Sequence, residues 1–308
     1  MIRTENLTKR YGKMEALKGL NLVIEKGSVF GFVGPNGAGK STTMLILATL
    51  LAPSGGRAFV GGYEVTKHPK EVRQLIGYMP DFFGVYDHLT AYEYLDFYAA
   101  NYDIPYRERR AIIPKLLELV NLSHKRDDFV DGLSRGMKQR LGLARCLVHN
   151  PDVLILDEPA SGLDPRARIE LREIIKELRN MGKTIIISSH ILPELAEMCT
   201  EIGIIEAGEL IAQGSVEEIY QQLKEEKLLK IRLLDRVEEL VTRLKASPLI
   251  TSITVEERIV TAGFQGSDEE QVQLLAALMT EGFPIASFGE AEGNLEELFM
   301  EITKGVGT

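Results

Sequence analysis

The chain has 308 residues, of which 44% are hydrophobic and 26% charged, as expected for a globular protein with a substantial core. Its net charge of −9 disfavours broad attraction to nucleic acid, so we expect no nucleic-acid partner. Two distant cysteines, Cys146 and Cys199, argue against a disulfide framework or zinc site, and neither a signal peptide nor a run of about 18 apolar residues is recognisable in the sequence.

The N-terminal part predicts antiparallel strands followed by a phosphate-binding loop. Residues 2–33 alternate polar and apolar positions, and Tyr11 lies in a turn between two strand-like runs. A buried strand at 28–33 and a helix at 43–50 flank a stretch that matches G-x-x-x-x-G-K-[ST] at every fixed position. This stretch consists of Gly34, Pro35, Asn36, Gly37, Ala38, Gly39, Lys40, Ser41 and Thr42.

The loop is expected to bind a nucleotide triphosphate. Backbone N–H groups and the positive end of the helix dipole meet at one point, and glycines let the backbone approach the phosphates. We expect Lys40 to reach the β and γ phosphates and the Ser41 hydroxyl to ligate Mg²⁺. The alternative is a glycine-rich turn that matches the pattern by chance.

The middle of the chain predicts a helical lobe at about residues 82–150. Short strands are expected at 57–60 and 76–79. Amphipathic helices follow at 91–102 and 107–120, and a third begins near Ser134. The tyrosine and phenylalanine side chains of the first helix are expected to pack rather than to stack on a ligand.

Two further apolar strands predict a parallel sheet that brings polar residues together. Strands at 153–157 and 184–188 flank a helix at 165–180, which Asp164 caps. Ligands of such sheets lie at the carboxyl ends of the strands, so Gly34, Asp157 and His190 should converge. There Asp157 would hold Mg²⁺ and Glu158 would act as general base. For Asp157 and Glu158, the alternative is an Asp-Glu pair that caps a loop. For His190, the alternative is a surface histidine.

A charge run at 224–227 predicts a boundary between a domain at 1–222 and an accessory α+β domain at 223–308. The pattern gives strands at 228–234, 250–255, 258–264 and 284–289, and helices at 236–245, 268–280 and 295–303. The order β-α-β-β-α-β predicts a ferredoxin-like module with a regulatory or interaction role. Capping boxes are expected at the pairs Asp235 and Glu238, Ser267 and Glu270, and Asn294 and Glu297.

Residues 133–140, Leu-Ser-Arg-Gly-Met-Lys-Gln-Arg, resemble the signature sequence of ATP-binding cassette (ABC) ATPases. Residues 161–164, Ser-Gly-Leu-Asp, resemble the D-loop of that family, His190 its switch histidine and Tyr11 its adenine-stacking aromatic residue. The resemblance extends over residues 2–220, in the order and spacing of the family. It implies a P-loop NTPase of ABC type, an α/β fold with a parallel-sheet core, an antiparallel β subdomain and a helical lobe.

The resemblance also implies a homodimer or heterodimer that holds two ATP molecules with Mg²⁺. Ser134 and Gly136 would contact the γ-phosphate bound by the partner, and Asp164 would belong to the same nucleotide interface. His190 would contact the γ-phosphate and hold Glu158 and water in line as the second catalytic residue. Separate transmembrane permease subunits would bind the chain at the cytoplasmic face of the plasma (inner) membrane, and the C-terminal extension resembles that of type-2 exporters.

Two residues depart from the family pattern. Arg135 replaces a glycine of the signature, and its guanidinium either adds charge near the phosphates or points to solvent. Asp81 replaces a glutamine that senses Mg²⁺, so we expect it to ligate the metal and to change the Mg²⁺ dependence. A soluble ABC ATPase of translation or DNA repair is the alternative function, although those families usually carry two cassettes or long insertions. A P-loop kinase or GTPase would not account for the signature, D-loop and histidine together.

Overall fold

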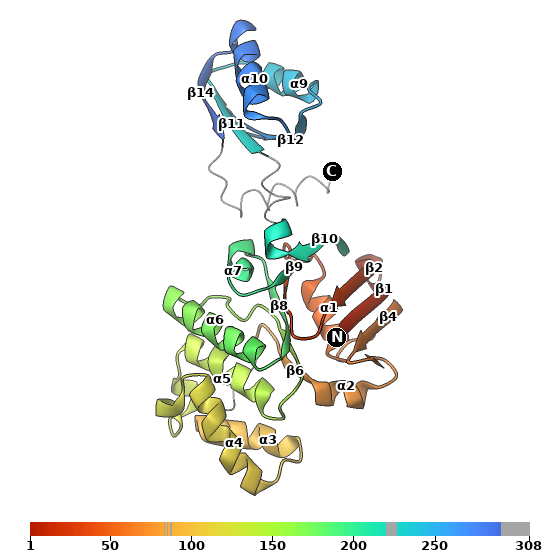
Figure 1. The fold of residues 1–308 in the computed structure, drawn as a ribbon, viewed down its shortest axis with the longest axis vertical. Coiled ribbons are helices and arrows are strands. Elements are labelled where there is room, and N and C mark those ends of the chain that lie inside the picture. The colour runs from red at the N-terminus through yellow and green to blue at the C-terminus, as the bar shows by residue number, and fades with distance from the viewer. Residues whose placement is uncertain (83, 85, 87, 220–226, 291–308) are drawn as a thin grey trace. The chain divides into compact units, whose positions relative to one another are not determined.

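The computed structural model describes residues 1–290 except 83, 85, 87 and 220–226. Contacts between Cα atoms divide the chain into a first unit, Met1–Val216, and a second unit that begins at Glu217. Figure 1 shows that each unit is built on sheets of its own. The boundary predicted between residues 222 and 223 lies outside the described residues, as do the predicted helix at 295–303 and the capping box of Asn294 and Glu297.

A six-stranded sheet forms the centre of the first unit, in the order β10-β9-β3-β8-β7-β6. Its five strands from β9 to β6 are parallel, and β10 pairs antiparallel at the edge. Strands β3, β7 and β8 are buried along their whole length because helices cover both faces of the sheet, which explains their continuous apolar runs. The strands are β3 (Val29–Val33), β6 (Ile76–Met79), β7 (Val153–Leu156), β8 (Thr184–Ser189), β9 (Glu201–Glu206) and β10 (Glu209–Ser215).

A four-stranded antiparallel sheet, in the order β2-β1-β4-β5, packs against the central sheet through helix α1. Met44 and Ile46 of α1 share a buried core with Leu20 of β2 and with Phe30 and Phe32 of β3. This core fixes the direction of α1 and therefore the place where its N-terminus points. The elements are β1 (Ile2–Tyr11), β2 (Met14–Ile24), β4 (Gly55–Val60), β5 (Tyr63–Glu64) and α1 (Lys40–Leu47).

The predicted helical lobe is present, and α5 connects it to the central sheet (Figure 1). Thr90 and Glu93 form a capping box at the start of α3, and Ser134 caps α5 as expected. Tyr94 is fully buried and contacts Tyr98, which agrees with a packing role for these aromatic side chains. Besides α1, the α-helices of the first unit include α2 (Pro69–Leu75), α3 (Ala91–Asn101), α4 (Tyr106–Leu119), α5 (Arg135–Leu147), α6 (Pro165–Asn180) and α7 (Leu192–Ala196).

The second unit has the predicted ferredoxin-like topology. Its antiparallel sheet has the order β12-β13-β11-β14, and one face packs on two helices. Ser267 and Glu270 form the expected capping box of α10. The elements are β11 (Lys227–Leu233), α9 (Val237–Lys245), β12 (Ile250–Glu256), β13 (Ile259–Phe264), α10 (Asp268–Thr280) and β14 (Ile285–Glu290).

The capping box predicted from Asp235 and Glu238 is wrong. Helix α9 begins after Arg236, which adopts a left-handed conformation with φ of 66°. The side chain of Asp235 accepts a hydrogen bond from the Arg236 N–H, and the Arg236 guanidinium binds Glu239 and the carbonyl of Gly282. This contact with a distant residue fixes the helix start one position later than the local pattern predicts.

Candidate functional site

The phosphate-binding loop connects the buried strand β3 to α1. Gly39 caps α1 with φ of 114°, a left-handed conformation that favours glycine. A Cβ atom on Gly34 would lie 2.2 Å from the Ile205 carbonyl oxygen, so glycine is required there for packing as well. The Lys40 side chain is 5% exposed, and its Nζ donates to the Gly34 carbonyl at 2.6 Å. The backbone of the loop thus binds the ammonium group of Lys40 from the same loop.

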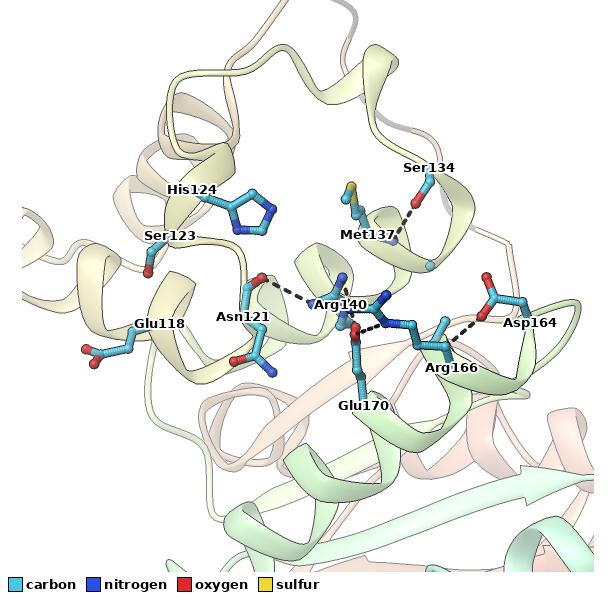
Figure 2. Close-up of a pocket in the computed structure, with 12 residues that line it drawn as sticks. Glu118, Asn121, Ser123, His124, Ser134, Met137, Arg140, Asp164, Arg166 and Glu170 are labelled. Carbon is cyan, nitrogen blue, oxygen red and sulfur yellow. Dashed lines mark hydrogen bonds and ion pairs between the residues drawn. The ribbon is translucent and has the colours of Figure 1, made fainter.

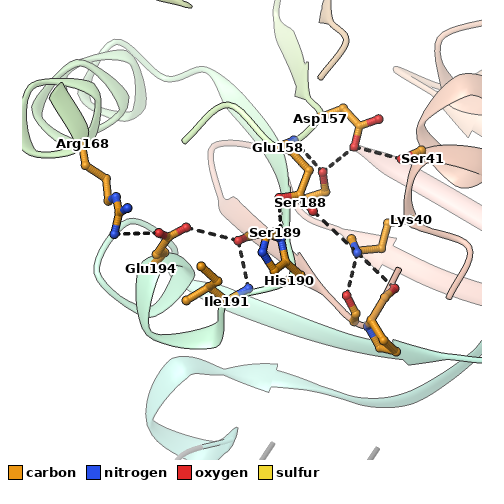
Figure 3. Close-up of polar contacts among 12 residues, drawn as sticks. Lys40, Ser41, Asp157, Glu158, Arg168, Ser188, Ser189, His190, Ile191 and Glu194 are labelled. Atoms are coloured by element: carbon orange, nitrogen blue, oxygen red, sulfur yellow. Dashed lines mark hydrogen bonds and ion pairs between the residues drawn. The ribbon is translucent and has the colours of Figure 1, made fainter. Parts of the chain in front are cut away.

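Two carboxylates follow β7 and reach the loop from the neighbouring part of the sheet (Figure 3). The Ser41 hydroxyl donates to Asp157 Oδ1 at 3.2 Å, and the Ser188 hydroxyl donates to the same oxygen at 2.6 Å. Glu158 Oε1 lies 3.6 Å from Lys40 Nζ. The prediction that Asp157 and the phosphate loop come together at the carboxyl ends of the parallel strands is therefore confirmed.

His190 contacts the second oxygen of Glu158. Its Nδ1 lies 3.1 Å from Glu158 Oε2, and the Ser188 hydroxyl accepts a hydrogen bond from the Glu158 N–H. Glu158 has a positive φ of 48°, a conformation that is uncommon for a residue with a side chain. The Glu158 side chain is 14% exposed and that of His190 is 49% exposed, so this edge of the site is open to solvent.

Most of these groups line one pocket of about 350 Å³, although Gly34, Asp157 and Ser188 are not part of its lining. Its lining contains most of the predicted nucleotide residues, Ser161 of the D-loop-like segment, and two residues that were not predicted, Met14 and Ala16. Burial lowers the pKa of Lys40, and the nearby carboxylates of Glu158 and Asp157 oppose that shift. The predicted residues in the lining are Tyr11, Pro35, Asn36, Gly37, Ala38, Gly39, Lys40, Ser41, Thr42, Asp81, Glu158 and His190.

Ser134, Gly136 and Asp164 line a different pocket, of about 690 Å³ (Figure 2). The Ser134 hydroxyl accepts from the Met137 N–H at 3.3 Å, and Asp164 accepts from the Ala167 N–H at 2.8 Å, so both side chains cap helices. Among the described residues, the two pockets share no lining residue. Within one chain, therefore, the signature does not complete the pocket of the phosphate loop.

The signature helix packs tightly on the start of α6. The Arg140 guanidinium lies 3.2 Å from Glu170 on α6 and donates to the Val120 carbonyl at the end of α4. The Arg135 guanidinium lies over Gly162 of the D-loop-like segment, where a Cβ atom would be 2.6 Å from its central carbon. Arg135 is exposed, but its guanidinium packs on the protein's own backbone rather than extending freely.

The donor set around the loop suits a hard divalent cation. Ser41 supplies a hydroxyl, and Asp157 and Asp81 supply carboxylates, which are the oxygen ligands that Mg²⁺ prefers. Within the described part of the chain, no group of three or more His, Cys, Asp or Glu side chains could hold a metal by itself. A cation at this place would therefore share its coordination with phosphate oxygens and water. In the same described residues, no helix is long and apolar enough to span a membrane.

Comparison with known proteins gives consistent matches. Residues 17–161 match the family model described as ABC transporter. The chain is 33% identical to the linearmycin resistance ATP-binding protein LnrL of Bacillus subtilis, over 98% of this chain and 98% of that one. It is 34% identical to the daunorubicin/doxorubicin resistance ATP-binding protein DrrA of Streptomyces peucetius, over 98% of this chain and 92% of that one. A solved dimeric ATP-binding cassette with ADP and phosphate superposes with a TM-score of 0.64 at 26% identity, over 70% of this chain and 99% of that one.

Proposed function

Because the chain belongs to the ABC transporter family of ATP-binding proteins, we propose that it is the subunit that powers export through separate membrane-spanning permease subunits. The chain hydrolyses ATP as members of this family do. One observation carries the assignment of roles: Lys40, Glu158 and His190 meet at one pocket, and the signature lines another. Each chain then supplies two complementary half-sites.

In the proposed reaction, the phosphate loop and Lys40 bind the β and γ phosphates, and Tyr11 stacks on the adenine. Ser41, Asp157 and Asp81 would hold Mg²⁺, which neutralises charge on the phosphates. Glu158 accepts a proton from the attacking water, and His190 orients Glu158 through the contact at 3.1 Å. The other carboxylate oxygen, Oε1, lies 3.6 Å from Lys40 Nζ, which places Glu158 beside the phosphate loop.

We propose that Ser134 and Gly136 of each protomer bind the γ-phosphate held by its partner, in a homodimer or a heterodimer with a second ATPase subunit. The N-terminus of α5 presents backbone N–H groups for this purpose. The solved dimeric cassette similar to this chain supports the arrangement. Asp164, which caps α6 beside this surface, belongs to the same interface.

The proposed permease contact is the region from residue 81 to 90 together with the helical lobe. Phe82 is 88% exposed, and Tyr86 and Phe97 are also exposed and contact each other edge to face. Large exposed aromatic side chains next to each other are typical of binding surfaces. This contact would hold the chain at the cytoplasmic face of the plasma (inner) membrane.

The names of the relatives favour export as the direction of transport and drug-like molecules as the substrates. LnrL and DrrA are named for resistance to linearmycin and to daunorubicin and doxorubicin, and both match nearly the whole chain, including the second unit. A pull-down from detergent-solubilised native membranes tests the proposal, using tagged Glu158→Gln with ATP and Mg²⁺ to trap the closed dimer. Recovery of a polypeptide with several membrane spans is expected. Recovery of ribosomes or nucleic acid instead would refute the transport role and leave only the ATPase activity.

A further inference from the structure

Two consecutive serines at the end of β8 point to opposite sides of the strand. Ser188 faces the catalytic carboxylates, where it donates to Asp157 and accepts from the Glu158 N–H. Ser189 faces α7, where its hydroxyl accepts from the Ile191 N–H at 3.0 Å and donates to Glu194 Oε2 at 3.3 Å (Figure 3). Because His190 lies between Ser189 and Ile191, these two bonds fix the backbone on both sides of the histidine.

Glu194 is held from its other oxygen by an arginine of α6. Arg168 Nη1 lies 2.8 Å from Glu194 Oε1, and the Glu194 side chain is only 9% exposed. A carboxylate this deeply buried is unfavourable unless it is paired and hydrogen-bonded, and here both oxygens have partners. The Glu194 side chain therefore has a fixed position, and the backbone that carries His190 is bonded to it through Ser189.

The same arginine contacts the D-loop-like segment. Arg168 Nη2 donates to the Leu163 carbonyl at 3.3 Å, and Leu163 itself is buried. Leu163 directly follows Gly162, on which the Arg135 guanidinium of the signature lies. A continuous set of contacts thus connects the signature, the D-loop-like segment, Arg168, Glu194 and the backbone that carries His190.

We propose that Glu194 is a positioning residue for ATP hydrolysis, which sets the placement of His190 according to the position of the D-loop-like segment. The inference rests on the proposed catalytic role of His190. A movement of residues 161–164 displaces the Leu163 carbonyl, and with it the bonded side chains of Arg168 and Glu194. This displacement changes the contact between the His190 ring and Glu158. Glu194 does not line the phosphate-loop pocket, so it acts on turnover and not on nucleotide binding.

Glu194→Gln tests this role because it keeps the size of the side chain and removes the charge that pairs with Arg168. We expect the nucleotide dissociation constant to stay the same and kcat to fall roughly 10- to 100-fold, since small misplacements of a catalytic group have effects of this size. Ser189→Ala, which removes the hydroxyl link and leaves the Arg168 pair, should lower kcat in the same direction. A change confined to the dissociation constant in both variants would overturn the proposal.

A matched control exists one helical turn away. Arg172 of α6 binds Glu197 at 2.5 Å, so this pair joins the same part of the chain, but Glu197 is exposed and is not bonded to Ser189. We expect Glu197→Gln to leave kcat unchanged. An equal loss of kcat in this control would show a general effect of loosening α7 on α6 and would refute the specific role of Glu194.

The decisive measurement repeats Glu194→Gln in a His190→Ala background under single-turnover conditions. If Glu194 acts through the histidine, the double variant hydrolyses ATP at the rate of His190→Ala alone. A further full loss from Glu194→Gln would overturn the coupling while leaving the proposed function intact. An undiminished rate in His190→Ala itself would refute both the role of His190 and the coupling, and the absence of ATP hydrolysis by the unmodified chain would refute the proposed function.

Discussion

Glu158→Gln is the substitution that most directly separates binding from chemistry at this site. Glutamine fills the same space, but an amide cannot accept the proton of the attacking water. General-base catalysis typically contributes about 10²- to 10⁴-fold to a rate, so kcat should fall by that factor, equivalent to about 3–5 kcal/mol in the activation free energy. His190, whose Nδ1 contacts Glu158 Oε2, is assigned an orienting role and is therefore not expected to replace this function.

Nucleotide binding should be retained or strengthened in the same variant. Glu158 Oε1 lies 3.6 Å from Lys40 Nζ, and removing this charge frees the ammonium group for the phosphates. Phosphate release at saturating ATP and the dissociation constant of ATP are the two measurements. Lys40→Ala is the control and should weaken binding itself, because it removes the group expected to contact the phosphates. Turnover close to that of the unmodified chain in Glu158→Gln would refute the assignment of the base.

Three further predictions concern stability and the metal. Gly162→Ala should lower the free energy of unfolding by about 1–2 kcal/mol for the left-handed backbone, and more while Arg135 is present; denaturant titration with and without Arg135→Gly separates the two effects. Asp81→Gln should shift the Mg²⁺ concentration for half-maximal ATPase activity, and an unaltered titration would contradict its role as ligand. Burial lowers the pKa of His149 from 6.5, so the folded state binds fewer protons than the unfolded state and loses stability as the pH falls below 6.5. Melting temperatures measured against pH should show this loss, and His149→Gln should show a smaller one.

The sequence predicts the convergence of the central groups correctly because it follows from local pattern and one topological rule. The phosphate loop, Asp157 and His190 all lie at the carboxyl ends of parallel strands, so apolar strand patterns are sufficient to bring them together. A helix that begins near Ser134 and the topology of the second unit are also predicted from the sequence, and the structure has both.

The contacts that the sequence analysis did not predict depend on pairings between distant elements. Ser188 and Ser189 acquire different partners only because β8 has a definite register beside β7 and α7 packs behind it. Helix α7, with five residues, and the edge strand β10 carry too little periodic signal to be recognised. The helix expected at Asp235 begins later because Arg236 bonds the distant Gly282 carbonyl, a contact that no local capping pattern contains.

The placement of the phosphate loop and the signature in separate pockets of one chain has a consequence for enzymology. If each working site needs one half from each of two chains, the specific activity of the free subunit rises with its concentration and falls on dilution. A chain with a defective signature and a chain with a defective phosphate loop would then restore one intact site when mixed. An excess of chains with both defects would instead suppress the activity of normal ones, since every mixed pair has lost half of each site.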